Sequence, residues 1–450
     1  MPRCVSRAYS KSLHLLLLLT FVLFWQASPV AGRIYIDINS PLQKKIPIAI
    51  PAFRHEGGDS AGLPLAERLA DTLGRALAFS GLFEVLSKAM FLEDPQVMGT
   101  TLGEIKFAEW SFLGADLLVR GTYRIRGNLL EMSGSLFDVV HQKLLLTKAY
   151  EGDIGAARQM ALRFGDDMMS YLTGEPGIFT SKIAFVGDAT GHKEIYFADF
   201  DGSHIVRLTH DNNIDLQPAW SADGKRISYV SYKSDQQELY VVDLMTGIAK
   251  KISRRSGLNM APAWHPRENK IAVTLTIDGN PEIYLLDDTG RILKQLTKNW
   301  AIDVSPSWCP DGSKVAYVSN RGGKPQIYIL DLQSGLTRRL TFDGAYNTSP
   351  AWSPRGDWIA YAGSRDGRFD LYLIRPDGTD LRQLTGGSGN NESPSWSPDG
   401  RLILFQSDRQ GKATLWVMLA NGSDQRRINL TIGGSHTEPA WSPRLTLTGP

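Results

Sequence analysis

Cysteine, long apolar runs and net charge are all scarce in this sequence. Only two cysteines occur in 450 residues, Cys4 and Cys309, and Cys4 lies in a segment that we expect to be cleaved, which excludes an internal disulfide. Lysine and arginine total 49 against 47 aspartate and glutamate residues, with no basic tract or charged block. The composition therefore gives no indication of binding to nucleic acid or to an anionic membrane surface, and it fits a globular protein of two domains.

One apolar run of some length is present, and it lies near the N-terminus. Three basic residues precede the mostly apolar stretch Leu15–Trp25, and small residues ending at Ala31 and Gly32 follow it. This stretch is too short and wrongly flanked for a membrane-spanning helix, and it is typical of a secretory signal peptide. We expect residues 1–32 to be a signal peptide cleaved after Ala31 or Gly32, with no direct membrane insertion of the exported chain.

A Pro-x-Trp phrase recurs six times in the second half of the chain. Its tryptophans lie 44 residues apart four times and 45 apart once, at Trp220, Trp264, Trp308, Trp352, Trp396 and Trp441. A fixed period of roughly 40–45 residues is typical of propeller blades. Turn residues and three further β-branched or aromatic segments follow each of the first five phrases, so each repeat predicts four strands. The sequence predicts a six-bladed β-propeller over residues 181–445.

The two ends of this repeat array complement each other. The strand-like segments that begin at residue 181 have no Pro-x-Trp phrase before them, and the sixth phrase, at 437–441, has no blade after it. We expect the strand at 437–441 to complete the blade that begins at residue 181 and so to close the ring.

Residues 33–172 predict a separate α/β domain. Leucines recur at helical spacing over 64–79, where Pro64 stands at the start of the helix. The expected strands are 33–38, 46–53, 83–86, 116–125, 129–139 and 142–150, and the other expected helices are 105–113 and 156–172. Residues 173–180, with Gly174-Glu175-Pro176-Gly177, are the expected linker to the propeller.

Catalytic motifs are few and lack their usual context. Gly58–Gly62 matches the G-x-S-x-G pattern around Ser60, but no strand ends directly before it and no oxyanion-hole segment is recognisable. No histidine or cysteine has metal-ligand spacing. Aspartates end the third strand of four repeats, at Asp199, Asp243, Asp287 and Asp331, where we expect them to form turns. The sequence predicts a protein without catalytic residues, metal or cofactor.

Each tryptophan is preceded, five residues earlier, by a polar residue that we call a collar residue. The six collar residues are Asp215, Asn259, Asp303, Asn347, Asn391 and His436. They stand at the start of the expected innermost strands and would ring one mouth of the central channel. Two compatible interpretations stay open: the side chains cap the loops that enter these strands, or they form a polar collar that grips a partner or an ion.

An export signal, an α/β domain opening with Arg33-Ile34-Tyr35-Ile36-Asp37, and repeats of Pro-x-Trp-Ser-Pro-Asp-Gly ending in Arg-Leu-Thr together resemble the TolB family of the Tol–Pal system. The resemblance covers the whole chain, and the order of the domains is its most specific feature. It implies a non-enzymatic periplasmic adaptor that binds the lipoprotein Pal through the propeller and TolA through the extreme N-terminus. The implied role is support of outer-membrane integrity and of constriction during cell division, with other outer-membrane proteins as further partners.

The resemblance also implies where the partners bind. For Pal, the matching positions lie in the loops before the Pro-x-Trp strands: Asp215, Leu258, Asn259, Asp303, Val304, Asn347, Asn391 and His436. For TolA, they are Arg33, Ile34, Tyr35, Ile36, Asp37 and Ile38, whose alternation suits a strand that adds to a sheet edge. An ordinary terminal strand of the α/β domain would have the same pattern.

Two other classes of protein stay open, an exported ligand-binding propeller and a propeller associated with a hydrolase. A hydrolase needs a catalytic domain of ordinary size beside the propeller, and neither end of the array provides one. A small-molecule binder needs aromatic or charged groups that converge in the channel, whereas the expected collar is mainly amide and carboxylate.

Overall fold

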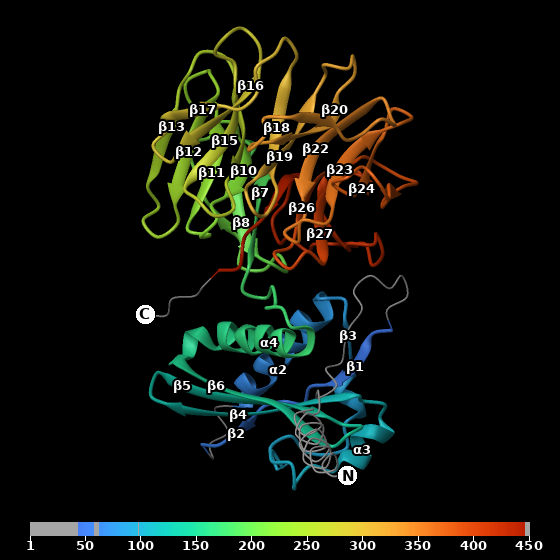
Figure 1. The fold of residues 1–450 in the computed structure, drawn as a ribbon. Coiled ribbons are helices and arrows are strands. Elements are labelled where there is room, and N and C mark those ends of the chain that lie inside the picture. The colour runs from blue at the N-terminus through green and yellow to red at the C-terminus, as the bar shows by residue number, and fades with distance from the viewer. Residues whose placement is uncertain (1–43, 58–62, 98, 446–450) are drawn as a thin grey trace, which may run out of the picture.

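The computed structural model describes residues 44–57, 63–97 and 99–445, and it shows an α/β region stacked on a β-propeller (Figure 1). The predicted signal peptide, the predicted strand at 33–38 and the Ser60 motif lie outside these described residues. Within them, no helix combines the length and the apolar composition that crossing a membrane requires.

The α/β region contains one sheet with strand order β3-β1-β4-β5-β6, and β2 pairs with β4. Strand β1 runs parallel to β3 and β4, whereas β4, β5 and β6 form an antiparallel meander. The elements are β1 (Ile46–Ala49), β2 (Arg54–His55), α2 (Leu63–Phe79), β3 (Phe83–Val85), η2 (Lys88–Met90), α3 (Phe107–Phe112), β4 (Leu117–Arg126), β5 (Leu129–Asp138), β6 (Lys143–Asp153), η3 (Ile154–Ala156) and α4 (Ala157–Thr173). Strand β1 is shorter than the predicted 46–53, because Pro51 has no N–H to donate to a neighbouring strand.

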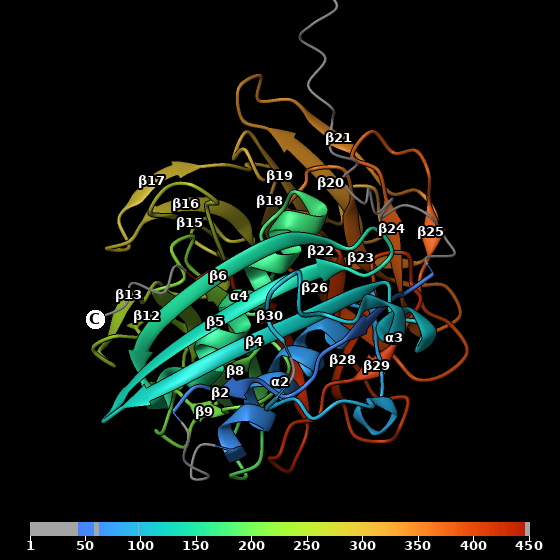
Figure 2. The ribbon, with the colours of Figure 1, turned by 90° about the horizontal axis from the view of Figure 1, so that it is seen from below.

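Helices α2 and α4 lie between this sheet and the propeller (Figure 1). The leucines at helical spacing in α2, among them Leu69, Leu73 and Leu77, are buried together with Phe164 and Met168 of α4. Figure 2, which views the molecule from below, shows the sheet and its helices lying in front of the propeller ring. The α/β region therefore covers one side of the propeller.

The propeller consists of six four-stranded antiparallel sheets. The first blade to be complete in sequence is β10 (Asp215–Trp220), β11 (Arg226–Ser231), β12 (Glu238–Asp243) and β13 (Ala249–Ser253). The next four blades are β14 (Asn259–Trp264), β15 (Lys270–Leu275), β16 (Glu282–Asp287) and β17 (Ile292–Gln295); β18 (Asp303–Trp308), β19 (Lys314–Ser319), β20 (Gln326–Asp331) and β21 (Thr337–Arg339); β22 (Tyr346–Trp352), β23 (Ile359–Ser364), β24 (Phe369–Ile374) and β25 (Arg382–Gln383); and β26 (Asn391–Trp396), β27 (Leu402–Ser407), β28 (Thr414–Leu419) and β29 (Arg426–Arg427). The first strand of each blade lies beside the first strands of its two neighbours, so these strands are the innermost ones.

The sixth blade confirms the predicted closure of the ring. It has the order β30-β7-β8-β9, with β7 (Lys182–Gly187), β8 (Glu194–Asp199), β9 (Val206–Arg207) and β30 (His436–Trp441). Strand β30 pairs antiparallel with β7, and Trp441 lies opposite Ile183. The indole N–H of Trp441 donates to the hydroxyl of Ser181 at 2.9 Å. Strand β30, the last strand of the described residues, thus completes the blade that begins with β7.

The repeated tryptophans join neighbouring blades. The indole N–H of Trp220 donates to the carbonyl of Ala440 at 3.0 Å, and that of Trp308 donates to the carbonyl of Ala263 at 3.0 Å. In both pairs the acceptor lies on the innermost strand of the preceding blade, and the tryptophans are buried. A large apolar ring with one polar edge suits this position, because it packs between two sheets and still satisfies its N–H.

Contacts between the α/β region and the propeller involve one mouth of the ring. Arg158 of α4 donates to Asp201 at 3.0 Å and to Ser203 at 2.7 Å, in the loop between β8 and β9. Arg426 donates to the backbone carbonyl of Phe79 at the end of α2. These contacts reach the loop after the third strand of one blade and the start of the fourth strand of another, so the opposite mouth, where the innermost strands begin, faces away from the α/β region.

Candidate functional site

The six collar residues stand at or next to the start of the innermost strands, as predicted, but their side chains are turned into the protein. All six are buried: Asp215, Asn259, Asp303 and Asn391 have 0% of their surface exposed, and Asn347 and His436 have 2%. Leu258 and Val304, the other two positions expected to contact Pal, are half-buried beside them. The predicted Pal contacts stay a prediction, and a partner at this mouth would first meet the residues around the collar.

Hydrogen bonds show that the asparagines of the collar hold loops. The Asn259 side chain accepts from the Ser253 hydroxyl at 2.5 Å and donates to the carbonyl of Arg255 at 2.7 Å. Asn347 donates to the side chain of Gln326 and to the carbonyl of Asp343, both at 2.8 Å. A buried amide with these partners is satisfied, so at these positions the loop-capping interpretation accounts for the residue type.

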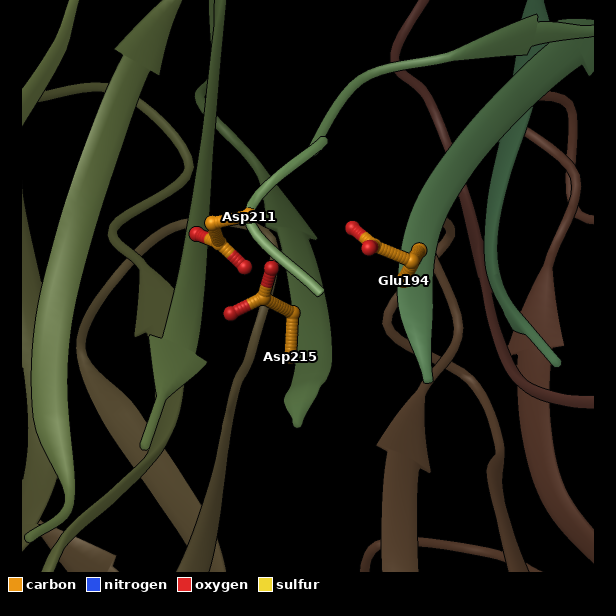
Figure 3. A group of neighbouring side chains, drawn as sticks. All are labelled: Glu194, Asp211 and Asp215. Carbon is orange, nitrogen blue, oxygen red and sulfur yellow. The ribbon is translucent and has the colours of Figure 1, made fainter. Parts of the chain in front are cut away.

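The two aspartates of the collar differ in their surroundings. Asp303 forms an ion pair with Arg321 at 2.8 Å and accepts from the Asn299 amide at 2.7 Å. Asp215 lies against the carboxylates of Glu194 and Asp211, and neither of its oxygens accepts a hydrogen bond of good geometry (Figure 3). Burial raises the pKa of Asp215, and the nearby Ser231 and Thr209 hydroxyls only partly oppose this effect.

A second ring of residues, two positions after the collar, lines the channel itself. These residues precede the proline of each Pro-x-Trp phrase, and with those prolines they line a cavity of about 260 Å³. All six have positive φ, between 51° and 56°: Gln217, Ala261, Ser305, Ser349, Ser393 and Glu438. The strand pairing shifts register at each of them. Positive φ in a non-glycine residue before proline is strained, so the surrounding blades must hold this bulge in place.

Sequence reasoning missed this ring of channel residues. Simple alternation along a strand does not foresee a bulge, and the residue before the proline varies between amide, hydroxyl, methyl and carboxylate. The one available signal was the invariant proline of the repeat, because proline in a sheet is usual at a bulge.

Side chains of the channel ring connect neighbouring blades. Glu438 accepts from the backbone N–H of Gln217 at 2.6 Å, and the Gln217 side chain accepts from the backbone N–H of Ala261 at 2.7 Å. On the other side, the backbone N–H of Glu438 donates to the side chain of Gln406 at 2.8 Å. Burial raises the pKa of the Glu438 carboxyl, although the hydrogen bond from Gln217 and the charge of Lys193 act in the opposite direction.

Exposed apolar side chains lie along part of the open mouth, from the entrance of β10 to that of β22, and we call this group the apolar rim. It consists of Ile214, Ile277, Trp300, Ile302, Phe342 and Tyr346. All lie in, or directly beside, the loops that enter the first or the third strand of a blade, which is the mouth turned away from the α/β region. Trp300 is 77% exposed and Phe342 is 71% exposed. Adjacent exposed aromatic and aliphatic groups of this kind are candidates for an interaction surface.

Comparison with known protein families supports the reading of both parts of the chain. Residues 169–445 match the family described as "TolB beta propeller domain", and residues 34–145 match the "TolB amino-terminal domain". The first match alone covers more than half of the 450 residues. The chain belongs to the TolB family.

Curated members of the TolB family and a solved structure agree with this assignment. The chain is 42% identical over 214 residues to the "Tol-Pal system protein TolB" of Desulfosudis oleivorans, a match that covers 48% of this chain and 49% of that protein. It is 41% identical over 201 residues to the protein of the same name from Syntrophotalea carbinolica, covering 44% and 46%. The chain thus spans about half the length of the curated relatives it matches. The crystal structure of TolB from Acinetobacter baumannii has a TM-score of 0.77 at 29% identity and covers 89% of this chain and 97% of that one.

Proposed function

We propose that this chain is a non-enzymatic periplasmic adaptor of the Tol–Pal system. In this role it binds Pal through the propeller and TolA through its N-terminal segment, and so supports outer-membrane integrity and constriction during cell division. Membership of the TolB family and the names of the relatives, "Tol-Pal system protein TolB", support the proposal. Export by a signal peptide at residues 1–32 belongs to the same proposal, as do further outer-membrane partners.

The domain boundaries in this proposal are 33–172 for the α/β domain, 173–180 for the linker and 181–445 for the propeller. The end of α4 at Thr173 and the start of β7 at Lys182 support them. For TolA we propose the segment from Arg33 to Ile38, because it is the first part of the mature chain and its alternating apolar side chains suit pairing with a sheet edge.

The apolar rim is the surface that we propose for Pal binding. The collar side chains are buried, so Pal would contact the rim and the half-buried Leu258 and Val304, which adjoin the collar residues Asn259 and Asp303 in the chain. Exposed aromatic residues such as Trp300 dominate the energetics of many protein interfaces, because they bury a large area at a small cost in side-chain entropy. We therefore expect Trp300 to contribute more to Pal affinity than any collar residue.

Replacing Trp300 by alanine tests this site. We expect Trp300→Ala to weaken Pal binding by about 2 kcal/mol, roughly 30-fold, with an unchanged melting temperature, since the side chain is 77% exposed. The measurement is calorimetric titration of the mature chain with purified Pal. Met245→Ala is the matched control, because Met245 is 86% exposed and lies in the loop between β12 and β13, at the other mouth. Equal Pal affinities for the wild type and the Trp300 variant would contradict the proposed site.

A further inference from the structure

A cavity of about 900 Å³ opens between two neighbouring blades, the one that begins with β18 and the one that begins with β22. We call it the inter-blade cavity. Its lining includes the turns that follow β18, β20 and β24, which belong to the mouth on the side of the α/β region. The volume lies in the range of ligand-binding pockets, and the mouth is the one opposite the apolar rim. The cavity therefore offers a site separate from the surface proposed for Pal.

One position of the repeat decides whether the space between two blades is filled. This position comes just after the third strand of a blade. In four blades its residue is apolar and packs into a core shared with the preceding blade: Phe200, Leu244, Leu332 and Ala420. The two remaining blades have Asp288 and Pro376 at this position, and these two residues line cavities.

At the first of these two sites, an ion pair closes part of the space. Asp288 accepts from Arg226 of the preceding blade at 3.0 Å, and the guanidinium of Arg226 lies 4.8 Å from the centre of the Trp264 ring. The cavity left between the blades that begin with β10 and β14 is smaller, about 560 Å³. A side-chain bridge over the aromatic ring thus takes up part of the volume there.

In the inter-blade cavity the described residues form no such bridge. Lys314 takes the position of the arginine and forms an ion pair with Asp331 of its own blade, and Pro376 takes the position of the aspartate. Trp352 is the equivalent tryptophan, and it lines the cavity. The larger volume therefore follows from two residue exchanges at this pair of blades.

The carboxylates of the inter-blade cavity are occupied by their own turns. Each of three lining aspartates accepts a hydrogen bond from a nearby hydroxyl: Asp311 from Ser313 at 2.7 Å, Asp331 from Ser334 at 3.0 Å, and Asp377 from Thr379 at 2.7 Å. Aspartates in this role hold the backbone of a turn. They therefore leave fewer acceptor positions for a cationic ligand.

Two guanidinium groups of the lining are available to a ligand. Arg267 and Arg338 are exposed, and neither side chain forms an ion pair or a hydrogen bond with any residue that the structure describes. Arg267 belongs to the blade that begins with β14, Arg338 to the next blade and Pro376 to the one after it, so three successive blades contribute to the lining. Guanidinium groups bind carboxylates through charge-assisted hydrogen bonds. The cavity therefore favours an extended ligand with acidic groups.

We propose that the inter-blade cavity binds an acidic segment of a partner protein. The carboxylates of this segment pair with Arg267 and Arg338, and an apolar side chain packs against Trp352 and against Leu336, which is 72% exposed. This interaction is additional to the proposed binding of Pal and TolA and does not depend on either.

Binding of a labelled peptide to the mature chain tests the proposal. The probe is a rhodamine-labelled Glu-Glu-Leu-Leu-Glu-Glu peptide, followed by fluorescence anisotropy. We expect saturable binding that weakens as salt is added, and no binding of the peptide with glutamine in place of glutamate at the same concentration. Arg338→Gln should weaken binding roughly 5-fold, as expected for the loss of a solvent-exposed ion pair.

A second variant closes the cavity. The double substitution Lys314→Arg with Pro376→Asp copies the ion pair that closes the smaller cavity, so it suits the fold. It should abolish peptide binding without lowering the melting temperature. Lys250→Gln is the matched control, because Lys250 occupies the position of Arg338 in the smaller cavity. This control should bind the peptide like the wild type.

The proposal is overturned if the wild type shows no saturable binding, if the closed variant binds as well as the wild type, or if Lys250→Gln weakens binding as much as Arg338→Gln. Equal binding of the glutamine peptide would overturn the assignment to an acidic ligand. Trp300→Ala should leave peptide binding unchanged, because Trp300 belongs to the apolar rim at the opposite mouth. Loss of peptide binding in this variant would place the acidic ligand on the rim and overturn the proposed site.

Discussion

At the scale of single residues, the inner surface of the propeller depends on side chains that reach from one blade to the next. Gln217 and Glu438 both bond to the backbone of a neighbouring innermost strand. They stand at bulges with positive φ, where strand pairing is interrupted and a backbone N–H needs another acceptor. These polar residues therefore replace ladder hydrogen bonds that the bulge removes.

Glu438 should make stability depend on pH. Its folded-state pKa is raised above the ordinary value of 4.5, so the folded protein binds the proton more tightly than the unfolded chain, and stability falls as the pH rises above about 4.5. Glu438→Gln keeps an acceptor for the N–H of Gln217 and removes this titration. We expect the variant to gain stability relative to the wild type as the pH is raised from 4.5 to 8, in urea unfolding experiments. Glu84→Gln, at an exposed position, is the control, and a difference that does not change with pH would contradict the assignment.

Replacing Asp303 tests whether the collar residues stabilise the fold or contact Pal directly. Asp303→Ala leaves Arg321 without its buried partner, and we expect a loss of roughly 2–4 kcal/mol in unfolding free energy, discounted because Arg321 is partly exposed. Since Asp303 itself has no exposed surface, Pal affinity of the folded fraction should stay within a factor of two. Melting curves and Pal titration measure the two effects. A large loss of Pal affinity at unchanged stability would instead make Asp303 a direct contact.

At the scale of elements, the innermost strands hold the six blades of the ring together. Each has a collar residue at or next to its first position, bulges at the channel residue and ends in the tryptophan that packs against the preceding blade. Strand β30 does this at the point where the two ends of the propeller meet, because it pairs with β7 on one side and lies beside β10 and β26 on the others. Strand β30 thus holds the two ends of the propeller together by hydrogen bonds and side-chain packing.

Removing β30 should open the ring. Truncation before Thr437 exposes the edge of β7 and removes Trp441, which alone buries ~150–250 Å², worth at most ~4–6 kcal/mol. Total stability is typically ~5–15 kcal/mol, so we expect a melting temperature at least 10 °C lower or an unfolded propeller. Truncation after Leu445 keeps β30 and is the control. A chain truncated before Thr437 with an unshifted melting temperature would show that closure does not depend on this strand.

At the scale of the whole molecule, the two mouths of the propeller have different surroundings. The α/β region packs against one mouth through Arg158 and Arg426, and its helices share a continuous buried core with β7, β8, β27 and β28. The other mouth presents the apolar rim. A partner bound on the rim would therefore lie on the side of the propeller turned away from the α/β region.

Deleting residues 33–40 tests whether the N-terminal segment binds TolA and the propeller binds Pal, as proposed. We expect the deletion to abolish TolA binding, while the propeller stays folded and still binds Pal. If Pal binding favours one state of the N-terminal segment, thermodynamic linkage requires TolA to change Pal affinity by the factor by which Pal changes TolA affinity. Titrations of each partner in the presence and absence of the other measure this factor. TolA binding that survives the deletion would place its site elsewhere in the chain.

The repeat made much of the fold predictable. The period of the tryptophans, the strand-like segments and the turn residues predicted six blades and the closure of β30 on β7. Apolar residues at helical spacing predicted the helices α2 and α4. Element boundaries agreed within a few residues, except that Pro51 ends β1 early.

The direction in which side chains point was decided by the tertiary structure. A bulge in each innermost strand shifts the register of its pairing. The residue before the proline therefore faces the channel, and the side chain of the collar residue is buried within the protein. Whether a buried polar group is satisfied depends on partners far along the chain, such as Arg321 for Asp303, and alternation along one strand carries no information on them. The sequence by itself therefore determined the number, order and closure of the blades, since these follow from local periodicity. The lining of the channel, the exposed rim and the burial of the Asp215 carboxyl beside Glu194 and Asp211 were decided only when the blades packed together, because each depends on neighbours that the repeat brings in from other blades.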